Sequence, residues 1–219
     1  MGDFASDGDK MSNRQVTTAT RAWHPWGATL FAITGVLAVF TLPGAKACLQ
    51  YDRVLIGQGQ WWRMLTSHWV HWTADHLLWD LMAFAALALC ALRIAQARAV
   101  GTLITASILI PITLWLFQPE MIYYRGLSGL ASALYVFVVV DLAAKARRDA
   151  KPLLEVVSWC MLLGFSAKVI FELATGQTLF VQSMGANVQG VPLAHLAGGI
   201  VGGGFAMGAD FGSLRSHKP

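Results

Sequence analysis

Residues 99–118 read AVGTLITASILIPITLWLFQ, a run of 20 residues without a single charged side chain. An α-helix needs about 20 mainly apolar residues to cross the hydrocarbon core of a bilayer. We therefore expect this stretch to be a membrane-spanning helix, bent near Pro111 because proline removes a helical hydrogen bond. Similar apolar runs predict five more such helices, at 27–43, 76–92, 127–143, 152–172 and 192–209.

The composition agrees with an all-α polytopic membrane protein of six transmembrane helices. The chain has 219 residues, of which 56% are hydrophobic and 13% charged, and its mean hydropathy is +0.53. Soluble domains are typically about 45–50% apolar and about 25% charged, so an ordinary soluble enzyme and a disordered chain are excluded. The net charge of +4 does not indicate a nucleic-acid partner, because the charged residues fall between the apolar runs. Its three cysteines are too few and too scattered for a disulfide framework.

We expect one six-helix membrane domain at residues 23–211, after a polar cytoplasmic segment at 1–22 and before a short cytoplasmic tail at 212–219. The orientation follows from the concentration of Lys and Arg on the inner side of membranes. With the N-terminus inside, eleven of the 16 Lys and Arg residues lie on the inner side and four on the outer side. Residues 1–20 lack the short basic start of a cleavable signal peptide, so we interpret the first apolar segment as a retained anchor.

A tryptophan-rich loop of about 30 residues, from Gly44 to Asp75, lies on the outer side in this topology. Tryptophan favours the membrane interface because its ring is apolar while its N–H is polar. We expect short amphipathic helices lying in the outer leaflet, as an interfacial belt or as a lateral entrance for a substrate embedded in lipid. The loop carries Trp61, Trp62, His68, Trp69, His71 and Trp72.

Polar residues within the apolar segments are the candidates for function. An ionisable group inside a bilayer is costly and usually faces the interior of the helix bundle, so each one marks a candidate site. The set comprises His76, Asp80, Ser128, Lys168, Glu172 and His195.

Ser128 and His195 form a candidate nucleophile and base. Ser128 lies in Gly126-Leu127-Ser128-Gly129 at a predicted helix start, where free N–H groups stabilise developing negative charge. Both residues lie near the outer ends of their helices, so a contact is geometrically allowed, although a buried His195 bonded to a neighbour is the alternative. No carboxylate partner for His195 is evident, so we expect a dyad rather than a triad. His195 also adjoins a face of small residues that lets another helix approach closely, formed by Ala194, Gly198, Gly202 and Ala206.

Two polar pairs are spaced four residues apart, which places each pair on one helix face. His76 and Asp80 would donate hydrogen bonds to an oxyanion, or bond to each other. Lys168 and Glu172 would form an ion pair within the membrane, or contact a substrate.

A zinc site is another interpretation of the histidines near position 71. Zinc needs ligands that converge tetrahedrally, but tryptophans crowd this interval and no cysteine assists. We therefore expect neither a metal nor another cofactor. Such a site would use His68, His71, Asp75 and His76.

Taken in order, these motifs resemble those of the rhomboid family of intramembrane serine proteases. That family has six helices, a Trp-Arg pair in a long first outer loop, His-x-x-x-Asn in the second helix, Gly-x-Ser-Gly at the fourth and Ala-His-x-x-Gly in the sixth. The similarity runs from about Trp61 to Gly202. The matching residues are Trp62-Arg63, His71, His76-x-x-x-Asp80, Gly126-Leu127-Ser128-Gly129 and Ala194-His195-Leu196-Ala197-Gly198.

The resemblance implies a serine endopeptidase in which Ser128 and His195 are catalytic and His76, Asp80 and Gly126 surround the oxyanion. Asp80 departs from the asparagine of the family, because an ionised carboxylate repels an oxyanion instead of donating to it. Either burial keeps Asp80 protonated, or Asp80 orients His76 and leaves His76 and the Ser128 N–H as donors.

Within the family, the sequence is most similar to the rhombosortase branch. The similarity lies in Tyr124-Arg125-Gly126-Leu127-Ser128-Gly129, in the Lys168/Glu172 pair and in the absence of a seventh helix. It implies a transmembrane protein substrate with a C-terminal sorting tail: a Gly-Gly-type motif, a transmembrane helix and basic residues. It also implies the bacterial inner membrane, with lipid contacts, both termini cytoplasmic, the active site open to the periplasmic side and no nucleic-acid partner.

Two other functions stay open at this point. One is a non-catalytic rhomboid-like protein that binds or escorts transmembrane helices, which only Asp80 favours. The other is a small transporter with Lys168, Glu172 and Asp80 as its polar path. Transporters often show repeated halves, and none is evident here.

Overall fold

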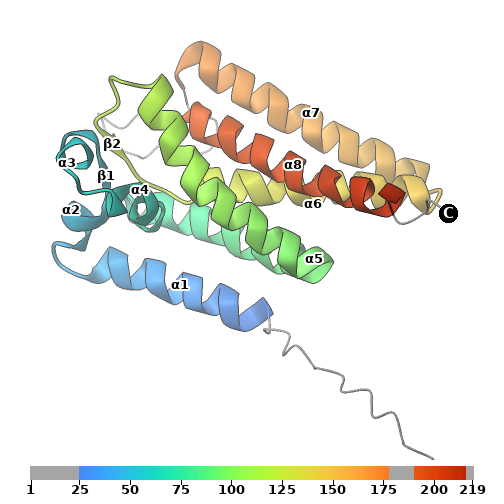
Figure 1. Ribbon diagram of the computed structural model, residues 1–219, viewed down its shortest axis with the longest axis horizontal. Coiled ribbons are helices and arrows are strands. Elements are labelled where there is room, and N and C mark those ends of the chain that lie inside the picture. Colours follow the sequence, from blue (N-terminus) through green and yellow to red (C-terminus); the bar gives the residue numbers. More distant parts are fainter. Residues whose placement is uncertain (1–24, 178–189, 216–219) are drawn as a thin grey trace, which may run out of the picture.

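The computed structural model describes residues 25–177 and 190–215, and in these ranges the chain is almost wholly helical (Figure 1), so the expected all-α class is confirmed. The predicted cytoplasmic segment at 1–22 and residues 216–219 of the predicted tail lie outside the described residues. The elements are α1 (Pro25–Thr41), α2 (Ala45–Leu49), β1 (Tyr51–Asp52), α3 (Arg53–Gly57), α4 (Trp62–Thr66), the 3₁₀ helix η1 (Ser67–Trp69), α5 (Ala74–Phe117), β2 (Tyr123–Tyr124), α6 (Ser128–Arg148), α7 (Pro152–Thr175) and α8 (Pro192–Arg215).

Three helices of the described ranges are long and apolar enough to cross a membrane, namely α5, α6 and α7. α1 is apolar but shorter, with 17 residues, and α8 carries the segment predicted as the last span. α7 and α8 begin at Pro152 and Pro192, the first residues of two predicted segments, and the first turn of a helix tolerates the missing N–H of proline.

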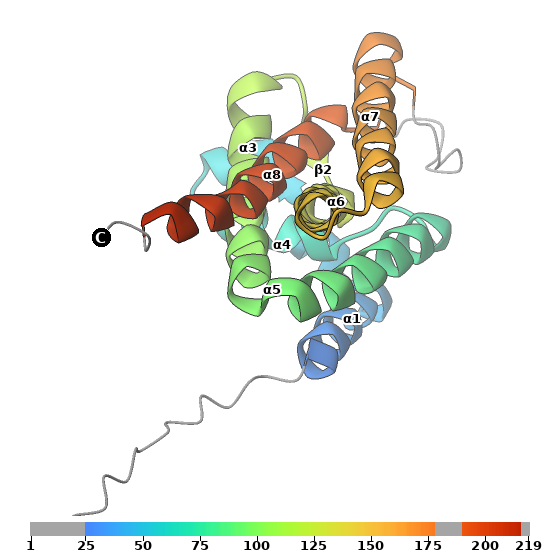
Figure 2. The same cartoon turned by 90° about the vertical axis from the view of Figure 1, so that its right-hand side faces the viewer.

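α5 is a continuous run of 44 residues whose direction changes at Ala95. There the backbone leaves helical geometry (φ −159°, ψ 89°), and Figure 2 shows the two arms running in different directions. The arms contain the predicted segments 76–92 and 99–118. At Pro111 the backbone stays helical, so the main bend lies at Ala95 rather than at the proline.

The region between α1 and α5 forms short helices and the strand β1. β1 pairs antiparallel with β2, with Tyr51 opposite Tyr124 and Asp52 opposite Tyr123. Tyr124 precedes Ser128 by four residues. This pairing therefore fixes the backbone that leads into α6.

Arg63, the arginine of the Trp-Arg pair, holds the region between α1 and α5 together by hydrogen bonds within it. Its side chain is buried and donates to the carbonyl oxygens of Ala47 (2.8 Å) and Gln50 (3.1 Å) and to Oε1 of Gln60 (2.7 Å). Because a buried charge is costly unless it is paired, these bonds explain why an arginine is tolerated here. The role of Arg63 is structural.

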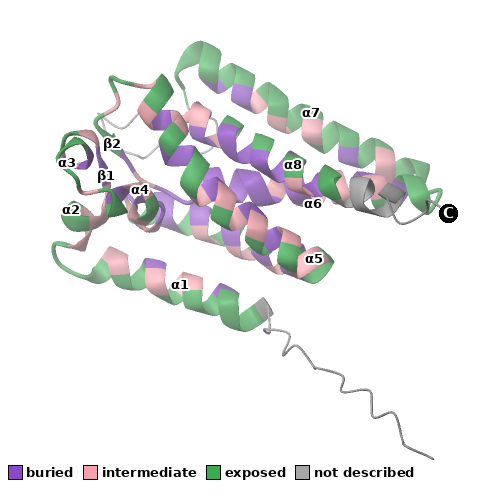
Figure 3. Ribbon diagram, viewed as in Figure 1, coloured by how far each residue is buried: buried purple, intermediate pink, exposed green. Residues whose placement is uncertain are grey.

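α6 is the central helix of the bundle. In its most apolar window 61% of the residues are buried, against 11% in α7. Figure 2 views α6 end-on with α5, α7 and α8 around it, and Figure 3 shows the buried residues concentrated there. Residues at the start of α6 therefore face a space enclosed by three other helices.

α8 packs against α6 through the small-residue face predicted from its sequence. A Cβ at Gly198 would overlap the Gly129 carbonyl oxygen, and one at Gly202 would overlap the Ala133 carbonyl oxygen. The backbones are thus too close for any side chain at either glycine. This approach brings the beginning of α8, with His195, beside the beginning of α6.

His68 links η1 to α5 and should make stability depend on pH. Its ring is buried, Nε2 lies 3.1 Å from the Ser107 carbonyl oxygen, and burial lowers the pKa of His68 from 6.5 to about 4. Below pH 6.5 the unfolded chain binds a proton at His68, whereas the folded chain binds it only when the pH nears 4. The free energy of unfolding should therefore fall by up to about 3 kcal/mol over this interval.

The variant His68→Gln tests this, because glutamine keeps a donor for Ser107 but does not titrate. Thermal unfolding in detergent should show a smaller loss of stability between about pH 7 and pH 5 in the variant than in the wild-type protein. Equal pH dependence of the two proteins would contradict the assignment.

Candidate active site

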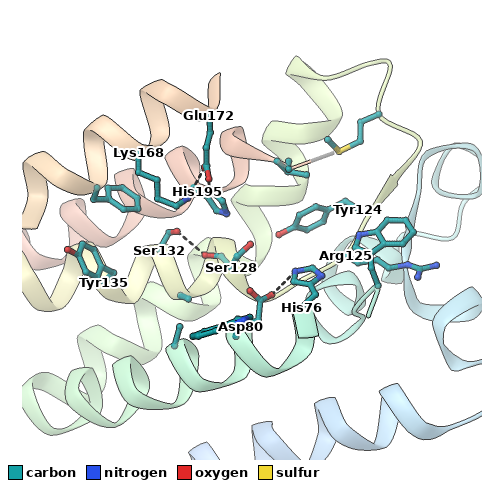
Figure 4. A pocket seen from close by; sticks show the side chains of 18 of the residues that line it. His76, Asp80, Tyr124, Arg125, Ser128, Ser132, Tyr135, Lys168, Glu172 and His195 are labelled. Atoms are coloured by element: carbon teal, nitrogen blue, oxygen red, sulfur yellow. Dashed lines mark hydrogen bonds and ion pairs between the residues drawn. The ribbon is translucent and has the colours of Figure 1, made fainter. Parts of the chain in front are cut away.

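A cavity of about 920 Å³ lies among α5, α6, α7 and α8. Its lining includes the candidate residues from all four helices, and Figure 4 shows Ser128 and His195 facing it from α6 and α8. The structure thus brings together side chains that are up to 119 positions apart in the chain. The candidates on this cavity are His76, Asp80, Ser128, Lys168, Glu172 and His195.

Ser128 is the first residue of α6, so N–H groups of the first helical turn surround it. The turn before it depends on Gly126, whose φ of +130° is one that side-chain-bearing residues rarely adopt. A Cβ at Gly126 would also lie 3.0 Å from Asp80 Oδ2 and 3.1 Å from His76 Nε2. Only glycine fits between the serine and this polar pair.

Both backbone polar groups of Gly126 are hydrogen-bonded. Its N–H donates to the Ser67 carbonyl oxygen (3.3 Å), and its own carbonyl accepts from the Tyr124 hydroxyl (3.2 Å). Burial, and then the Asp80 charge, raise the pKa of Tyr124, so the phenol stays a donor. Gly126 thus shapes the turn before Ser128, and its place beside the oxyanion stays a prediction.

Asp80 is an acceptor shared by three N–H groups. Its Oδ2 lies 3.2 Å from His71 Nε2, 3.2 Å from His76 Nε2 and 2.8 Å from the Leu127 backbone nitrogen. Asp80, His71 and His76 are all buried. The carboxylate therefore ties the loop before α5, the first turns of α5 and the residue preceding Ser128 to one point.

The histidines direct their Nε2 atoms at this carboxylate and not at a common metal site. The rings of His71 and His76 meet edge to face, with centroids 5.1 Å apart. Within residues 25–177 and 190–215, no group of three or more His, Cys, Asp or Glu side chains is arranged to hold a metal ion. His71 belongs to the Asp80 cluster, a placement that the sequence motifs alone did not indicate.

Ser128 and His195 line the same cavity, but no hydrogen bond joins them in the described part of the chain. Catalytic hydrogen bonds are often long without substrate and tighten in the complex, so the gap does not exclude a nucleophile and its base. The Ser132 hydroxyl donates to the Ser128 carbonyl oxygen (2.9 Å) and not to the Ser128 side chain. The Ser128 side chain faces the cavity (Figure 4).

His195 has the carboxylate neighbour that the sequence did not reveal. Its Nδ1 lies 3.1 Å from Oε2 of Glu172, and Lys168 Nζ donates to the same oxygen over 2.7 Å. The predicted Lys168–Glu172 pair is therefore confirmed, and the expectation that His195 has no carboxylate partner is wrong. The sequence did not indicate this contact, because the spacing of four residues pairs Glu172 with Lys168 on the same helix, whereas His195 lies 23 positions further along the chain.

A model of the Rhomboid domain matches residues 58–210, which covers the cavity-lining helices from α5 to α8. No curated protein matches the chain.

Proposed function

Because the chain belongs to the rhomboid family, we propose that it is an intramembrane serine endopeptidase with Ser128 as nucleophile and His195 as general base. The observation that carries this proposal is that both side chains line one cavity, from the first turns of two tightly packed helices. The serine also has free N–H groups of a helix start around it, where a developing oxyanion is stabilised.

The proposed membrane domain at 23–211 crosses the bilayer six times. α1, the two arms of α5, α6, α7 and α8 each make one crossing, and the region from α2 to η1 lies in the outer interface. Both termini are cytoplasmic, as the excess of Lys and Arg on that side favours. The cavity then opens to the periplasmic side of a bacterial inner membrane, where water can reach Ser128.

The reaction proceeds through an acyl-enzyme. His195 accepts the Ser128 proton as the hydroxyl attacks the scissile carbonyl, and then gives that proton to the leaving amine. Water hydrolyses the ester in the second half of the cycle, with His195 acting again as base. The proposed oxyanion donors are the Ser128 N–H and His76, whose Nε2 has to turn from Asp80 Oδ2 toward the oxyanion as it forms.

The proposed substrate is a membrane-anchored secreted protein with a C-terminal tail of the Gly-Gly type. Support comes from the resemblance of the residues 124–129 and of the Lys168/Glu172 pair to the rhombosortase branch. The substrate helix would enter from the side and unwind at its small residues, because glycine has a low helix propensity.

Cleavage in proteoliposomes tests the proposal. The substrate is a single-span protein with a Gly-Gly motif before its span and basic residues after it. We expect Ser128→Ala to lower the cleavage rate by about 1,000-fold or more, because alanine has no hydroxyl with which to form the acyl-enzyme. Ser166→Ala is the matched control, since Ser166 is exposed on α7 and bonds only within its own helix, to the Leu162 carbonyl.

Cleavage by Ser128→Ala at the rate of Ser166→Ala would contradict the assignment of the nucleophile. A folded wild-type protein that retains the tailed substrate without cutting it would instead support a non-catalytic helix-binding function.

A further inference from the structure

The carboxylate of Glu172 on α7 contacts the imidazole of His195 on α8. Glu172 Oε2 lies 3.1 Å from His195 Nδ1, and this single oxygen also accepts from Lys168 Nζ over 2.7 Å. Lys168 Nζ stands 3.2 Å from the same imidazole nitrogen. Figure 4 shows the three side chains converging at the edge of the cavity that holds Ser128.

Glu172 is 2% exposed, which makes its placement informative. α7 is mostly exposed, and only Ser158, Val169 and Glu172 among its residues are buried. A buried carboxylate is costly unless charged or hydrogen-bonding partners compensate for the lost water. Here Lys168 compensates the charge, while the hydrogen bond to His195 joins it to the proposed reaction centre.

The contact decides which imidazole nitrogen can act as the base. If Nδ1–H donates to Glu172, the lone pair is on Nε2, which is then free to accept the Ser128 proton. If Nδ1 instead accepts from Lys168, the proton is on Nε2 and the ring cannot act as a base there. Lys168 is closer to Glu172 (2.7 Å) than to Nδ1 (3.2 Å), so its bond to the carboxylate leaves Nδ1 to donate.

We propose that Glu172 is a positioning residue that completes a Ser128–His195–Glu172 triad by holding the tautomer and orientation of His195. This inference rests on the proposed serine-protease function. Lys168 shares the carboxylate oxygen and limits how strongly Glu172 stabilises the imidazolium. During acylation Nε2 gains the Ser128 proton and later passes it to the leaving amine, while Nδ1–H stays bonded to Glu172, which remains ionised throughout.

The helix itself does not depend on Glu172 for its attachment. The Tyr135 hydroxyl donates to the Met161 carbonyl (3.1 Å), and the Tyr135 and Phe165 rings pack with centroids 5.5 Å apart. Phe165 also fills the space in front of Gly199 of α8. α7 should therefore remain docked when Glu172 is changed.

The test compares Glu172→Gln, Glu172→Asp and the matched control Glu155→Gln. Glutamine keeps the size but can donate to Nδ1, which selects the wrong tautomer. We expect kcat to fall by about 100- to 10,000-fold with little change in KM, as for the loss of a triad carboxylate. Aspartate should restore part of kcat. Glu155 lies on α7 away from the cavity and pairs with Arg147, so Glu155→Gln should match the wild-type protein.

The pH–rate profile separates positioning from a structural role. Loss of the carboxylate in Glu172→Gln leaves Lys168 beside the ring, so the acidic limb should move to lower pH by about one unit or more. Lys168→Met removes the opposing charge, and its acidic limb should move to higher pH. These opposite shifts are not expected from loosened packing. The other titratable groups lining the cavity are His76, Asp80, Glu120, Tyr123, Tyr124, Arg125 and Tyr135, and none of them changes between these variants.

The outcomes distinguish this inference from the function on which it rests. Wild-type cleavage that needs Ser128, together with a Glu172→Gln kcat equal to that of Glu155→Gln, overturns the triad alone. Cleavage that is insensitive to Ser128→Ala overturns both. If Glu172→Gln does not fold, the pH–rate profiles of Lys168→Met and Glu172→Asp decide. An acidic limb of Lys168→Met at the same pH as that of the wild-type protein overturns the triad.

Discussion

Replacing Asp80 with alanine should reduce cleavage by about 100-fold or more. The change removes the acceptor of the His71, His76 and Leu127 N–H groups at once, and all three are held by a single oxygen. The His76 ring then loses the partner that holds its Nε2 beside the start of α6, and the Leu127 amide loses its hydrogen bond to α5. Loss of one oxyanion donor typically lowers a rate by about 100- to 1,000-fold.

The variants Asp80→Asn and Asp149→Ala make this experiment specific. The asparagine oxygen still accepts from the Leu127 N–H, so we expect activity within about tenfold of the wild-type protein. Asp149 is an exposed carboxylate beyond the far end of α6, so its removal should have little effect. Full activity of Asp80→Ala, measured as kcat on the tailed substrate, would contradict the positioning role.

Gly202→Ala should strongly destabilise the helix bundle. The added Cβ would overlap the Ala133 carbonyl oxygen of α6, and a backbone atom cannot move aside as a flexible side chain can. Overpacking of a well-packed interior typically costs about 1–3 kcal/mol. Because α8 also carries His195, we expect activity to fall together with the unfolding temperature in detergent.

Gly204→Ala is the matched control on the same helix. Nothing lies within 4 Å of a Cβ at Gly204, and alanine has the higher helix propensity, so its unfolding temperature should equal or exceed that of the wild-type protein. Equal unfolding temperatures for the two variants would contradict the close α6–α8 packing.

The helices were predictable because lipid imposes a simple requirement. Every backbone N–H and C=O in the bilayer core must be bonded internally, so long apolar runs become helices. The break at Ala95 lies between the predicted segments 76–92 and 99–118, but the sequence did not predict that it would be confined to one residue. Its residue carries no special propensity, whereas Pro111 does and yet stays within a helical arm. The direction of the chain there depends on packing against other helices, which residue types alone do not encode.

The sequence predicted those parts of the candidate site that lie within one motif, but it did not predict the contacts between separate elements. The Gly126-Leu127-Ser128-Gly129 motif identified the turn that carries Ser128, and the φ of +130° at Gly126 explains why glycine is needed there. The bond between Glu172 and His195 crosses two helices, and the approach of His71 to Asp80 joins a loop to a helix. Such contacts depend on tertiary geometry, and spacing along the chain does not reveal them.

The central claim is that Ser128 is an activated nucleophile. The most direct measurement treats the purified protein with a fluorophosphonate probe and locates the adduct by mass spectrometry. The account predicts one modified residue, Ser128, and loss of its labelling in His195→Ala, while Ser166→Ala labels like the wild-type protein. A folded wild-type protein that carries the adduct on another serine, or that labels equally well without His195, would contradict the account.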